Sequence, residues 1–397
     1  MRLLMINHNV AFTGGATFFR ALHLARHLVA GGDQVTLLCS HFGAISRFVP
    51  QTTDGVQVVQ APGCLPRRWR YGYDYYEAWR RVRWVRAQPR FDIVYAFDSR
   101  PVVVYPALAA QRLGARLVMD WCDWFGRGGA VEERANLVLR LGLRPLETYY
   151  EEAFRRCADA TTVIGSFLEA RALALGLPAN TILRLPGGAD VEHLQPQPAV
   201  TARAAVGLPP RGALVGYLGS LFRDDAALLA QAWSTVQRAL PGAQLVLIGD
   251  SKSAVAVEHG VIRTGFVPYA QLGAYLAACD VLCLPLTDSL ANRGRWPSKL
   301  MDYFAVGRAT VGCDVGEVGA IIREAQAGIV ARPDSASLAA NLLELLGQAE
   351  LAEECGRRAR RCAETRYNWA TLTDTLRQLC RGLLADTGGA RPANICV

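Results

Sequence analysis

Short apolar runs alternate with amphipathic stretches along most of this chain, and no other feature of the sequence constrains its fold as much. Runs rich in Val, Ile and Leu predict buried β-strands, and the apolar spacing between them predicts helices. Strands that alternate with helices in this way form parallel sheets covered on both faces, so the sequence predicts an α/β protein. The predicted strands are Leu3–Ile6, Gln34–Leu38, Val56–Val59, Asp92–Ala96, Arg116–Met119, Thr161–Ile164, Ala213–Leu218, Gln244–Ile248, Val261–Thr264, Val281–Leu284, Ala309–Gly312 and Gly328–Val330.

The alternation occurs in both halves of the chain, which predicts two doubly wound domains. A chain of 397 residues, of which 51% are hydrophobic, is too long for one compact core. A proline-rich polar stretch between Gln195 and Pro210 marks the boundary. We therefore expect one domain over residues 1–195 and a second over residues 200–365, and a tail without periodicity over residues 388–397.

One short predicted helix has the features of a nucleotide site. Pro297 suits a first helical turn, and Gly307 suits the left-handed position just past the end. Lys299 and Asp302 are three residues apart and therefore share one face of this helix. The helix N-terminus and the Lys299 ammonium suit a phosphate, and the Asp302 carboxylate can accept hydrogen bonds from ribose hydroxyls.

Lys299 also stands out because lysine is rare in this chain. Lys252 and Lys299 are the two lysines among 43 basic residues, and the other basic residues are arginines. A lysine kept beside a predicted phosphate site suits a role that needs a compact, mobile ammonium. The alternative is a chance lysine on an ordinary surface helix.

Other predicted donor contacts follow strands of the second half. Gly219 and Ser220 come directly after the strand Ala213–Leu218, and Arg223 opens the next helix, which predicts a second phosphate contact. Phe266 and Val267 follow the strand Val261–Thr264, where the backbone could contact a nucleotide base. A plain surface loop explains these two residues almost as well.

Two strand ends in the first half are also candidate binding sites. Gly14 and Gly15 lie between the first strand and a helix, where glycine lets backbone N–H groups approach a ligand, although a plain turn is the alternative. Asp120 and Asp123, with Trp121 and Trp124, follow the strand Arg116–Met119. Carboxylates and indoles suit a sugar site, and Asp123 could act as a base. Alternatively, the tryptophans belong to the core and the acids cap a helix.

The net charge of +8 is concentrated between Arg67 and Arg90, a segment dense in arginines and aromatic residues. On a helix from about Asp74, an apolar stripe that includes Tyr75 and Trp79 would lie beside Arg80, Arg81, Arg83 and Arg86. Cationic flanks beside an aromatic stripe suit an anionic membrane surface. The rival interpretation is an ordinary surface helix packed by that stripe, with arginines that bind an anionic acceptor. We expect no nucleic acid partner, because no binding module accompanies the charge.

The sequence also bears on the compartment. It contains no run of 18 uninterrupted apolar residues, and its N-terminus does not lead into a signal-peptide core. The eleven cysteines are scattered without a zinc-ligand spacing, as in a reducing compartment. We therefore expect a cytoplasmic protein, and the basic segment adds the hypothesis of peripheral attachment to the inner face of the cell membrane.

Taken together, these motifs resemble glycosyltransferase family 4, the group 1 glycosyltransferases. The segments that carry the resemblance are Thr13–Ala16, Phe91–Tyr95, Leu185–Asp190, Val215–Gly219, Phe266–Tyr269, Pro297–Gly307 and Tyr367–Trp369. The resemblance implies the GT-B fold, in which two Rossmann-like domains face a central cleft. It also implies that a terminal helix, about residues 367–385, packs back on the N-terminal domain.

The resemblance implies an enzyme that transfers a hexose from a nucleotide diphosphate sugar. It also implies retention at the anomeric carbon and a reaction without a metal or other cofactor. The acceptor would be a glycan, lipid-linked or small molecule, as in the synthesis of cell envelope polysaccharides. Asp120, Asp123 and Lys299 are the candidate catalytic residues. The family often has a carboxylate eight residues before Asp302, where this chain has Gly294, so Asn292 or, alternatively, Asp288 is the candidate contact for the donor sugar.

Two other functions are compatible with the same motifs. A sugar-nucleotide epimerase shares the two-domain fold and uses a nucleotide sugar without an acceptor. A non-catalytic relative would bind a nucleotide sugar or a carbohydrate as a partner subunit.

Overall fold

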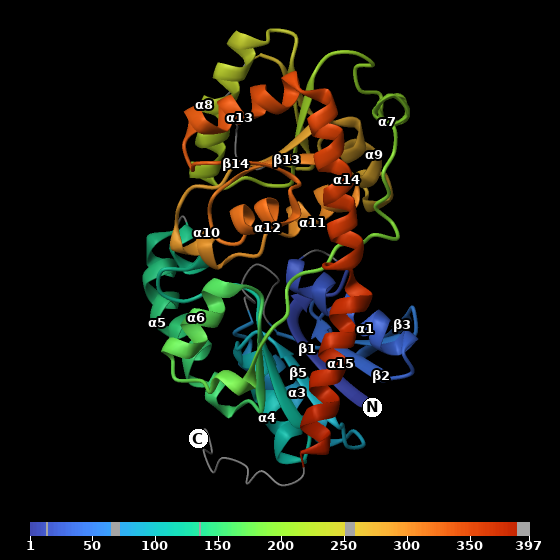
Figure 1. Cartoon of the computed structure of the whole chain (residues 1–397). Helices are drawn as coiled ribbons and strands as arrows, with labels where there is room; N and C mark the ends of the chain where they lie inside the picture. The colour runs from blue at the N-terminus through green and yellow to red at the C-terminus, as the bar shows by residue number, and fades with distance from the viewer. Residues whose placement is uncertain (13–14, 65–71, 135, 251–258, 387–397) are drawn as a thin grey trace. The chain divides into compact units, whose positions relative to one another are not determined.

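The computed structural model describes the chain except residues 13–14, 65–71, 135, 251–258 and 387–397. The chain forms two compact α/β units (Figure 1). The first comprises Met1–Pro186, Gly294–Trp296 and the chain from Trp369 onward, and the second comprises Gly187–Arg293 and Pro297–Asn368.

An eight-stranded sheet forms the centre of the first unit, in the order β3-β4-β2-β1-β5-β6-β7-β8. All neighbouring strands are parallel except β3, which pairs antiparallel with β4. The chain runs outward from β1 through β2 and then returns to the other side of β1 at β5. The strands are β1 (Arg2–Val10), β2 (Gln34–Ser40), β3 (Val49–Thr53), β4 (Val56–Ala61), β5 (Ile93–Phe97), β6 (Arg116–Trp121), β7 (Ala160–Val163) and β8 (Ile182–Arg184).

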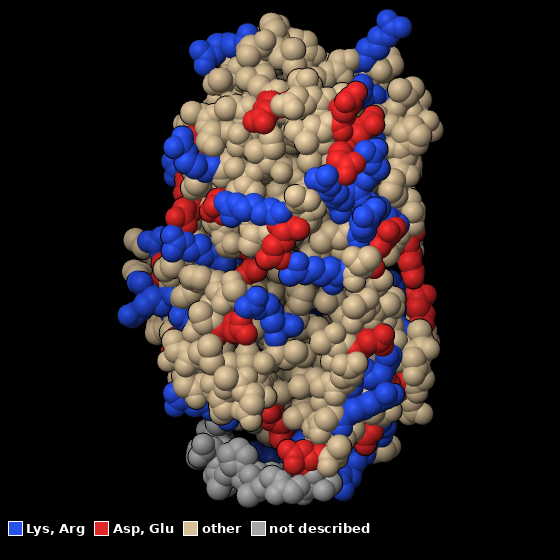
Figure 2. Space-filling model, in the orientation of Figure 1, with Lys and Arg blue, Asp and Glu red and all other residues tan. Residues whose placement is uncertain are grey.

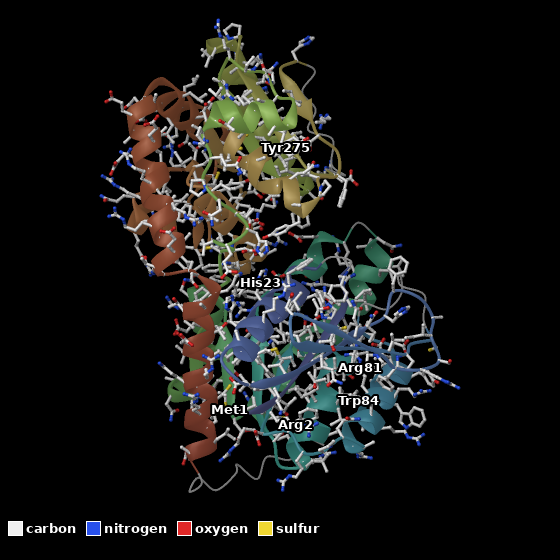
Figure 3. All side chains as sticks on the ribbon, turned by 90° about the vertical axis from the view of Figure 1, so that its right-hand side faces the viewer. Met1, Arg2, His23, Arg81, Trp84 and Tyr275 are labelled. Atoms are coloured by element: carbon white, nitrogen blue, oxygen red, sulfur yellow. The ribbon has the colours of Figure 1, made fainter. Side chains whose placement is uncertain are left out.

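Helices cover both faces of this sheet, because alternate strand residues point to opposite sides. Leu3 and Met5 pack with α1 and α15 on one face, whereas Leu4 and Ile6 pack with α3, α4 and α5 on the other. His23 of α1 stacks on Trp369, the first residue of α15, with ring centroids 5.1 Å apart (Figure 3). The helices are α1 (Ala16–Ala30), α3 (Tyr75–Arg86), α4 (Pro101–Arg112), α5 (Leu137–Ala153), α6 (Ser166–Ala174) and α15 (Trp369–Ala385), with short 3₁₀ helices at Ala130–Glu133, Arg155–Cys157 and Ala179–Thr181.

The second unit has a six-stranded, entirely parallel sheet in the order β11-β10-β9-β12-β13-β14. Its strands are β9 (Leu214–Leu218), β10 (Gln244–Ile248), β11 (Val261–Arg263), β12 (Val281–Leu284), β13 (Ala309–Cys313) and β14 (Gly328–Ala331). Its helices are α7 (Ala199–Val206), α8 (Arg223–Ala239), α9 (Tyr269–Ala278), α10 (Leu290–Gly294), α11 (Ser298–Ala305), α12 (Val318–Ala325), α13 (Ser335–Gly347) and α14 (Ala349–Thr365).

All twelve predicted strands are present within one or a few residues of their predicted ends, and β3 and β8 are additional. The predicted helix after Pro297 is α11, and Gly307 has the left-handed φ of 66° expected beyond its end. Over the residues that the structure describes, no helix combines the length and apolar character needed to span a bilayer.

Candidate functional site

Each sheet has a point where the order of the strands reverses, and ligands of doubly wound folds bind at the carboxyl ends of the strands there. In the second unit the reversal lies between β9 and β12, and in the first it lies between β1 and β5. The candidate site residues of each unit should therefore lie near these strand ends.

Lys299 lies in the first turn of α11 and reaches the end of β9. Its Nζ donates a hydrogen bond to the carbonyl oxygen of Ser220 at 3.1 Å, and it contacts the Tyr217 hydroxyl. Gly219 has a φ of 82°, and a Cβ there would lie 3.4 Å from Lys299 Cε. The structure thus brings Lys299, Gly219 and Ser220 together, with the ammonium group held beside the chain that leaves β9.

Arg223 is the first residue of α8, as the sequence predicted. Its side chain is exposed, and the N-cap residue Phe222 offers no polar side-chain atom to the free N–H groups of the first turn. An uncapped helix N-terminus next to an arginine is a suitable place for an anion. This helix start follows the same strand end that Lys299 approaches.

Asp302 lies one turn after Lys299 on α11 and faces a second carboxylate, Asp190. Burial and, to a smaller extent, the Asp190 charge together raise the pKa of Asp302 to about 7, although the Lys299 charge acts in the opposite direction. Asp190 itself accepts hydrogen bonds from the Tyr269 hydroxyl at 2.8 Å and from the His193 backbone N–H at 3.2 Å. Asp302 is therefore a carboxyl group held in a costly position, as is common at binding sites.

Asn292 does not point to an open site. Its side-chain amide donates to the Thr287 carbonyl oxygen at 2.9 Å and to Asp225 Oδ1 at 3.2 Å, and the residue is buried. In this structure the amide holds the loop between β12 and α10, and donor binding by Asn292 stays a prediction that this geometry does not favour.

The two residues predicted to contact a base are placed differently from each other. Phe266 is 83% exposed, whereas Val267 is half-buried. Both follow Gly265, which pairs with Gly249 at the end of β10. They lie at the carboxyl edge of the second sheet, two strands away from β9.

The glycines after β1 are only partly described. Gly14 lies outside the described residues. Gly15 precedes α1 with a φ of 106°, and a Cβ there would meet the Asn9 side chain at 1.9 Å. Because the space is filled by Asn9, the need for glycine at position 15 follows from local packing as well as from any ligand.

Asp120 is fully buried in a network of its own unit. Its two carboxylate oxygens accept hydrogen bonds from Arg20 at 2.9 and 3.0 Å. The hydroxyls of Tyr95 and Thr162 also donate to Asp120, at 3.1 and 2.6 Å. Both oxygens are occupied and buried, and the carboxylate holds β6 to α1, β5 and β7; the catalytic role of Asp120 stays a prediction that this geometry does not favour.

Asp123 lies beyond the end of β6 and is about one-third exposed, with a side-chain exposure of 34%. The pKa of Asp123 is raised to about 6, chiefly by desolvation; the Arg295 guanidinium, 4.0 Å away, opposes this shift and the Glu133 charge adds to it. A carboxyl group that titrates near neutral pH and reaches solvent can accept a proton from a bound hydroxyl.

The neighbouring tryptophans are core residues, as the alternative interpretation held. Trp121 is fully buried and donates its Nε1–H to Glu151, whereas Trp124 is 9% exposed and donates to the Arg127 carbonyl oxygen. The Arg171 guanidinium covers the Trp124 ring at 3.9 Å. Neither indole face is open for stacking on a sugar.

Sequence reasoning missed a buried ionic cluster at the reversal point of the first sheet. His8 in β1 and Asp98 just after β5 are 2.9 Å apart, and Arg100 Nη1 lies 3.0 Å from His8 Nε2. Asp98 has a φ of 105°, a strained conformation that persists at functional sites when the surroundings enforce it. Burial acts to raise the pKa of Asp98, but the Arg100 charge and the contact with His8 outweigh it and hold that pKa well below its usual range.

A signal for this cluster was present in the sequence. His8 and Asp98 are polar residues at the ends of two strands that were both predicted, and adjacent strand ends meet at one edge of a sheet. Which strands are neighbours could not be predicted, so the pair could not be recognised. Glu147 of α5 extends the cluster through ion pairs with Arg100 at 3.6 Å and Arg134 at 2.6 Å.

The two parallel-sheet α/β units define the class of the protein: it has the GT-B fold. The chain belongs to the group 1 glycosyltransferases, because residues 212–348 match the family model described as glycosyl transferases group 1 and residues 14–188 match the glycosyl transferase 4-like domain.

Similar proteins include enzymes with different sugar substrates. The GDP-mannose-dependent alpha-(1-6)-phosphatidylinositol monomannoside mannosyltransferase of Mycobacterium tuberculosis is 25% identical over 245 residues. This match covers 57% of the chain and 64% of the mannosyltransferase, so the chain spans less than two thirds of that relative's length.

Two solved structures extend the comparison to nearly the whole chain. Sucrose-phosphate synthase from Thermosynechococcus elongatus has a TM-score of 0.76 and 16% identity over 97% of this chain and 99% of its own. The Anabaena protein HepE, solved with UDP and glucose, has a TM-score of 0.70 and 15% identity over 96% of this chain and 100% of its own. At these identities the likeness concerns the fold.

Proposed function

We propose that this protein transfers a hexose from a nucleotide diphosphate sugar to an acceptor hydroxyl, with retention at the anomeric carbon. The observation that carries the proposal is the position of Lys299, whose ammonium lies beside Ser220 at the end of β9, one turn from Asp302. The Lys299 ammonium and the free N–H groups of the helix start suit the diphosphate of a donor. The Asp302 carboxylate, one turn further along the helix, suits its ribose.

The chemistry proposed for these residues is electrostatic. When the bond between the anomeric carbon and the diphosphate oxygen breaks, negative charge accumulates on the diphosphate. Lys299, Arg223 and the N-termini of α8 and α11 would stabilise that charge. The acceptor oxygen forms the new bond to the anomeric carbon on the same face, and its proton passes to the departing diphosphate. We propose that these groups suffice without a metal, so that a chelator leaves the activity unchanged.

The identity of the donor is a narrower proposal. The mycobacterial relative is named for GDP-mannose, and HepE was solved with UDP and glucose. Both names support a nucleoside diphosphate sugar, and they differ in the base. A thermal-shift series with UDP, GDP and their sugars would identify the base that stabilises the protein most.

For the acceptor we propose a glycan or lipid-linked hydroxyl bound by the first unit. Asp123 is a partly exposed carboxyl group there, and the pair of His8 and Asp98 lies at the reversal point of the same sheet. The relative named for phosphatidylinositol mannoside supports an acceptor attached to a lipid.

An anionic membrane surface is a further proposed partner. The predicted basic segment, Arg67–Arg90, includes α3, and residues 65–71 lie outside the described residues. Arg83 and Arg86 are exposed and Arg80 is half-buried, so these three could reach lipid headgroups. Arg81 is fully buried and could not (Figure 3). The predicted apolar stripe is also divided, because Ala78 and Val85 are buried whereas Tyr75 and Trp79 are exposed.

The proposal is tested by product analysis with purified protein. Free nucleoside diphosphate that appears only when an acceptor is present indicates transfer. An epimerised nucleotide sugar without acceptor would instead identify an epimerase. Nucleotide-sugar binding with neither product would identify a non-catalytic binding protein.

A further inference from the structure

The two central strands of the second sheet separate towards their carboxyl ends. β9 and β12 pair as far as Gly216 and Leu282. On its other side β9 pairs with β10 as far as Leu218. If the ladder between β9 and β12 continued, its next hydrogen bond would run from the Leu218 N–H to the Cys283 carbonyl oxygen. These two backbone groups therefore mark the place where the strands part, at the reversal point of the sheet.

A tyrosine hydroxyl from α11 lies between these two backbone groups. Tyr303 Oη accepts a hydrogen bond from the Leu218 N–H at 3.0 Å and donates one to the Cys283 carbonyl oxygen at 3.3 Å. The side chain is fully buried. Burial keeps the pKa of Tyr303 well above its usual range, so the hydroxyl stays protonated and can donate. One hydroxyl therefore satisfies a backbone group of each strand at the point where they part.

Lys299 lies one turn before Tyr303 on the same side of α11. Residues four apart on a helix are neighbours on its surface, and both of these side chains reach the end of β9. Tyr303 contacts Leu218, whereas Lys299 Nζ donates to the Ser220 carbonyl oxygen at 3.1 Å. The helix is thus fixed against β9 by a buried hydroxyl, and the preceding turn carries the ammonium.

A second tyrosine restrains the ammonium. Tyr217 belongs to β9 and is buried. Its hydroxyl donates to the Ser220 carbonyl oxygen at 3.0 Å and is contacted by Lys299 Nζ, which lies 4.4 Å from the centroid of the Tyr217 ring. A lysine side chain is flexible, so these contacts reduce the number of positions open to its charge. A cation held in place before a ligand binds stabilises charge without a further cost of reorganisation.

The surface of the second unit carries charges of both signs. On the face that Figure 2 shows, acidic and basic side chains alternate over α14, where Glu354 pairs with both Arg357 and Arg358. Neighbouring charges of opposite sign offset each other, so α14 does not present a broad basic surface to a diphosphate. The position of a single ammonium, that of Lys299, is correspondingly important.

We propose that Tyr303 is a positioning residue for the donor diphosphate. Its hydroxyl holds α11 against the separated ends of β9 and β12 and thereby places the Lys299 ammonium, which Tyr217 restrains. Without this hydroxyl the Leu218 N–H and the Cys283 carbonyl oxygen lose their shared partner, and the helix is free to shift. The inference rests on the proposed function, since it names the residue that prepares Lys299 for the diphosphate. Tyr303 itself is buried and acts through Lys299.

The first test observes Lys299 in the full chain without any nucleotide. Isotopically labelled lysine gives side-chain NMR signals from Lys252 and Lys299, the two lysines of the chain, and Lys252→Arg assigns them. The nearby Tyr217 ring displaces the Lys299 signal from that of an exposed lysine. Tyr303→Phe should move this signal towards the exposed value. A merely structural role would lower the melting temperature and leave the signal in place.

The second test measures nucleotide affinity by calorimetry, with whichever of UDP and GDP binds the wild type more tightly. Tyr303→Phe should raise the dissociation constant about 5-fold or more, and by no more than Lys299→Ala does. In the Lys299→Ala background the same substitution should add less than about 2-fold, because its effect passes through Lys299.

The matched control is Tyr150→Phe. Tyr150 is a buried tyrosine of the first unit, and its hydroxyl lies 2.7 Å from that of Tyr105. The control also loses a hydroxyl that makes hydrogen bonds, so it should lower the melting temperature. It should leave both the Lys299 signal and the dissociation constant unchanged.

Two results would overturn the proposal. One is a Lys299 signal that Tyr303→Phe leaves in place or that Tyr150→Phe moves equally. The other is a dissociation constant on which Tyr303→Phe and Lys299→Ala act independently. If Tyr303→Phe does not fold, Tyr217→Phe takes its place, because it removes the hydroxyl that Lys299 contacts and should move the same signal. A wild type that binds neither UDP nor GDP would contradict the proposed function, whereas the Lys299 signal tests the positioning without nucleotide, so the two can fail independently.

Discussion

Lys299 is the residue on which the proposed chemistry depends most. Its ammonium is held beside the Ser220 carbonyl and lies 4.4 Å from the centroid of the Tyr217 ring. If it stabilises charge on the departing diphosphate, Lys299→Ala should lower kcat about 10²-fold or more, as expected for the loss of one preorganised group. Initial rates at saturating donor and acceptor measure this effect.

The control for that variant is Arg238→Ala, because Arg238 is an exposed cation at the far end of α8. Its kcat should equal that of the wild type. Full activity of Lys299→Ala would remove the residue from the mechanism. Lys299→Arg should recover only part of the rate, because a planar guanidinium does not replace a compact ammonium in the same space.

Asp120 and Asp123 lie in one short segment but differ in burial, so the effects of substituting each of them can be compared. Asp120→Asn leaves Arg20 buried without its counter-charge, which should cost about 3–5 kcal/mol of unfolding free energy. Asp123→Asn should not lower the free energy of unfolding at pH 7, because burial already disfavours the charged form of Asp123. It should lower kcat/KM for the acceptor about 10-fold or more if the carboxylate binds the reacting hydroxyl. Urea denaturation and acceptor kinetics on both variants decide the assignment, and it is wrong if Asp123→Asn retains full acceptor kinetics.

Asp302 predicts a pH dependence of stability with a definite sign. Its pKa of about 7 in the folded protein exceeds the usual value near 4 of an unfolded chain. Between these values the folded state binds more protons, so this group lowers stability as pH rises from about 4 to about 7. Asp302→Asn should therefore raise the melting temperature at pH 8 more than at pH 5. An equal shift at both values would show that the carboxyl group is not protonated in the fold.

The sequence could indicate which residues of the second unit lie together. Lys299, Gly219 and Ser220 follow from local signals, a strand end and a helix start, and they are neighbours in the structure, whereas their binding role stays a prediction. The burial of Asp120 could not be predicted, because it depends on neighbours far along the chain, here Arg20 and Thr162. The strained φ of Asp98 has no sequence signal at all.

At the scale of elements, α3 shows how two arginines two residues apart can have opposite roles. Arg81 is fully buried and donates to the backbone oxygens of Asn7 and Val102, whereas Arg83 is exposed. Arg81→Gln should destabilise the protein by about 3–5 kcal/mol because it leaves the Glu77 carboxylate buried without a counter-charge. Arg83→Gln should change stability by less than about 0.5 kcal/mol. Denaturant titration measures both, and similar values for the two variants would contradict the burial of Arg81.

The composition and length of a strand decide whether it can be predicted from the sequence. Buried parallel strands such as β10 and β12 were predicted with their observed ends, because runs of apolar residues are a strong signal. The edge strand β3 was missed because it contains Pro50 and is almost entirely exposed, so it lacks an apolar run. The three-residue strand β8 was too short to show any pattern.

At the scale of the whole molecule, the candidate residues for the two substrates fall in different units. The proposed donor residues Lys299, Asp302 and Ser220 belong to the second unit, and the proposed acceptor residue Asp123 belongs to the first. Ser220 follows β9 at the reversal point of the second sheet, whereas Asp123 follows β6, the strand next to β5 in the first sheet. The two substrates should therefore respond to different substitutions in equilibrium binding, even though both are needed for turnover.

This division predicts a specific result for nucleotide binding to the full-length protein. By calorimetry, Lys299→Ala should weaken binding of a nucleoside diphosphate about 10-fold or more, because it removes a charge-assisted contact with phosphate. Asp123→Asn should leave that dissociation constant unchanged, because Asp123 lies in the other unit. The double variant should then bind nucleotide as weakly as Lys299→Ala alone, since distant and independent sites are additive. If Asp123→Asn weakened nucleotide binding as much as Lys299→Ala does, the assignment of donor and acceptor to separate units would be wrong, and both carboxylate and ammonium would have to act on the donor.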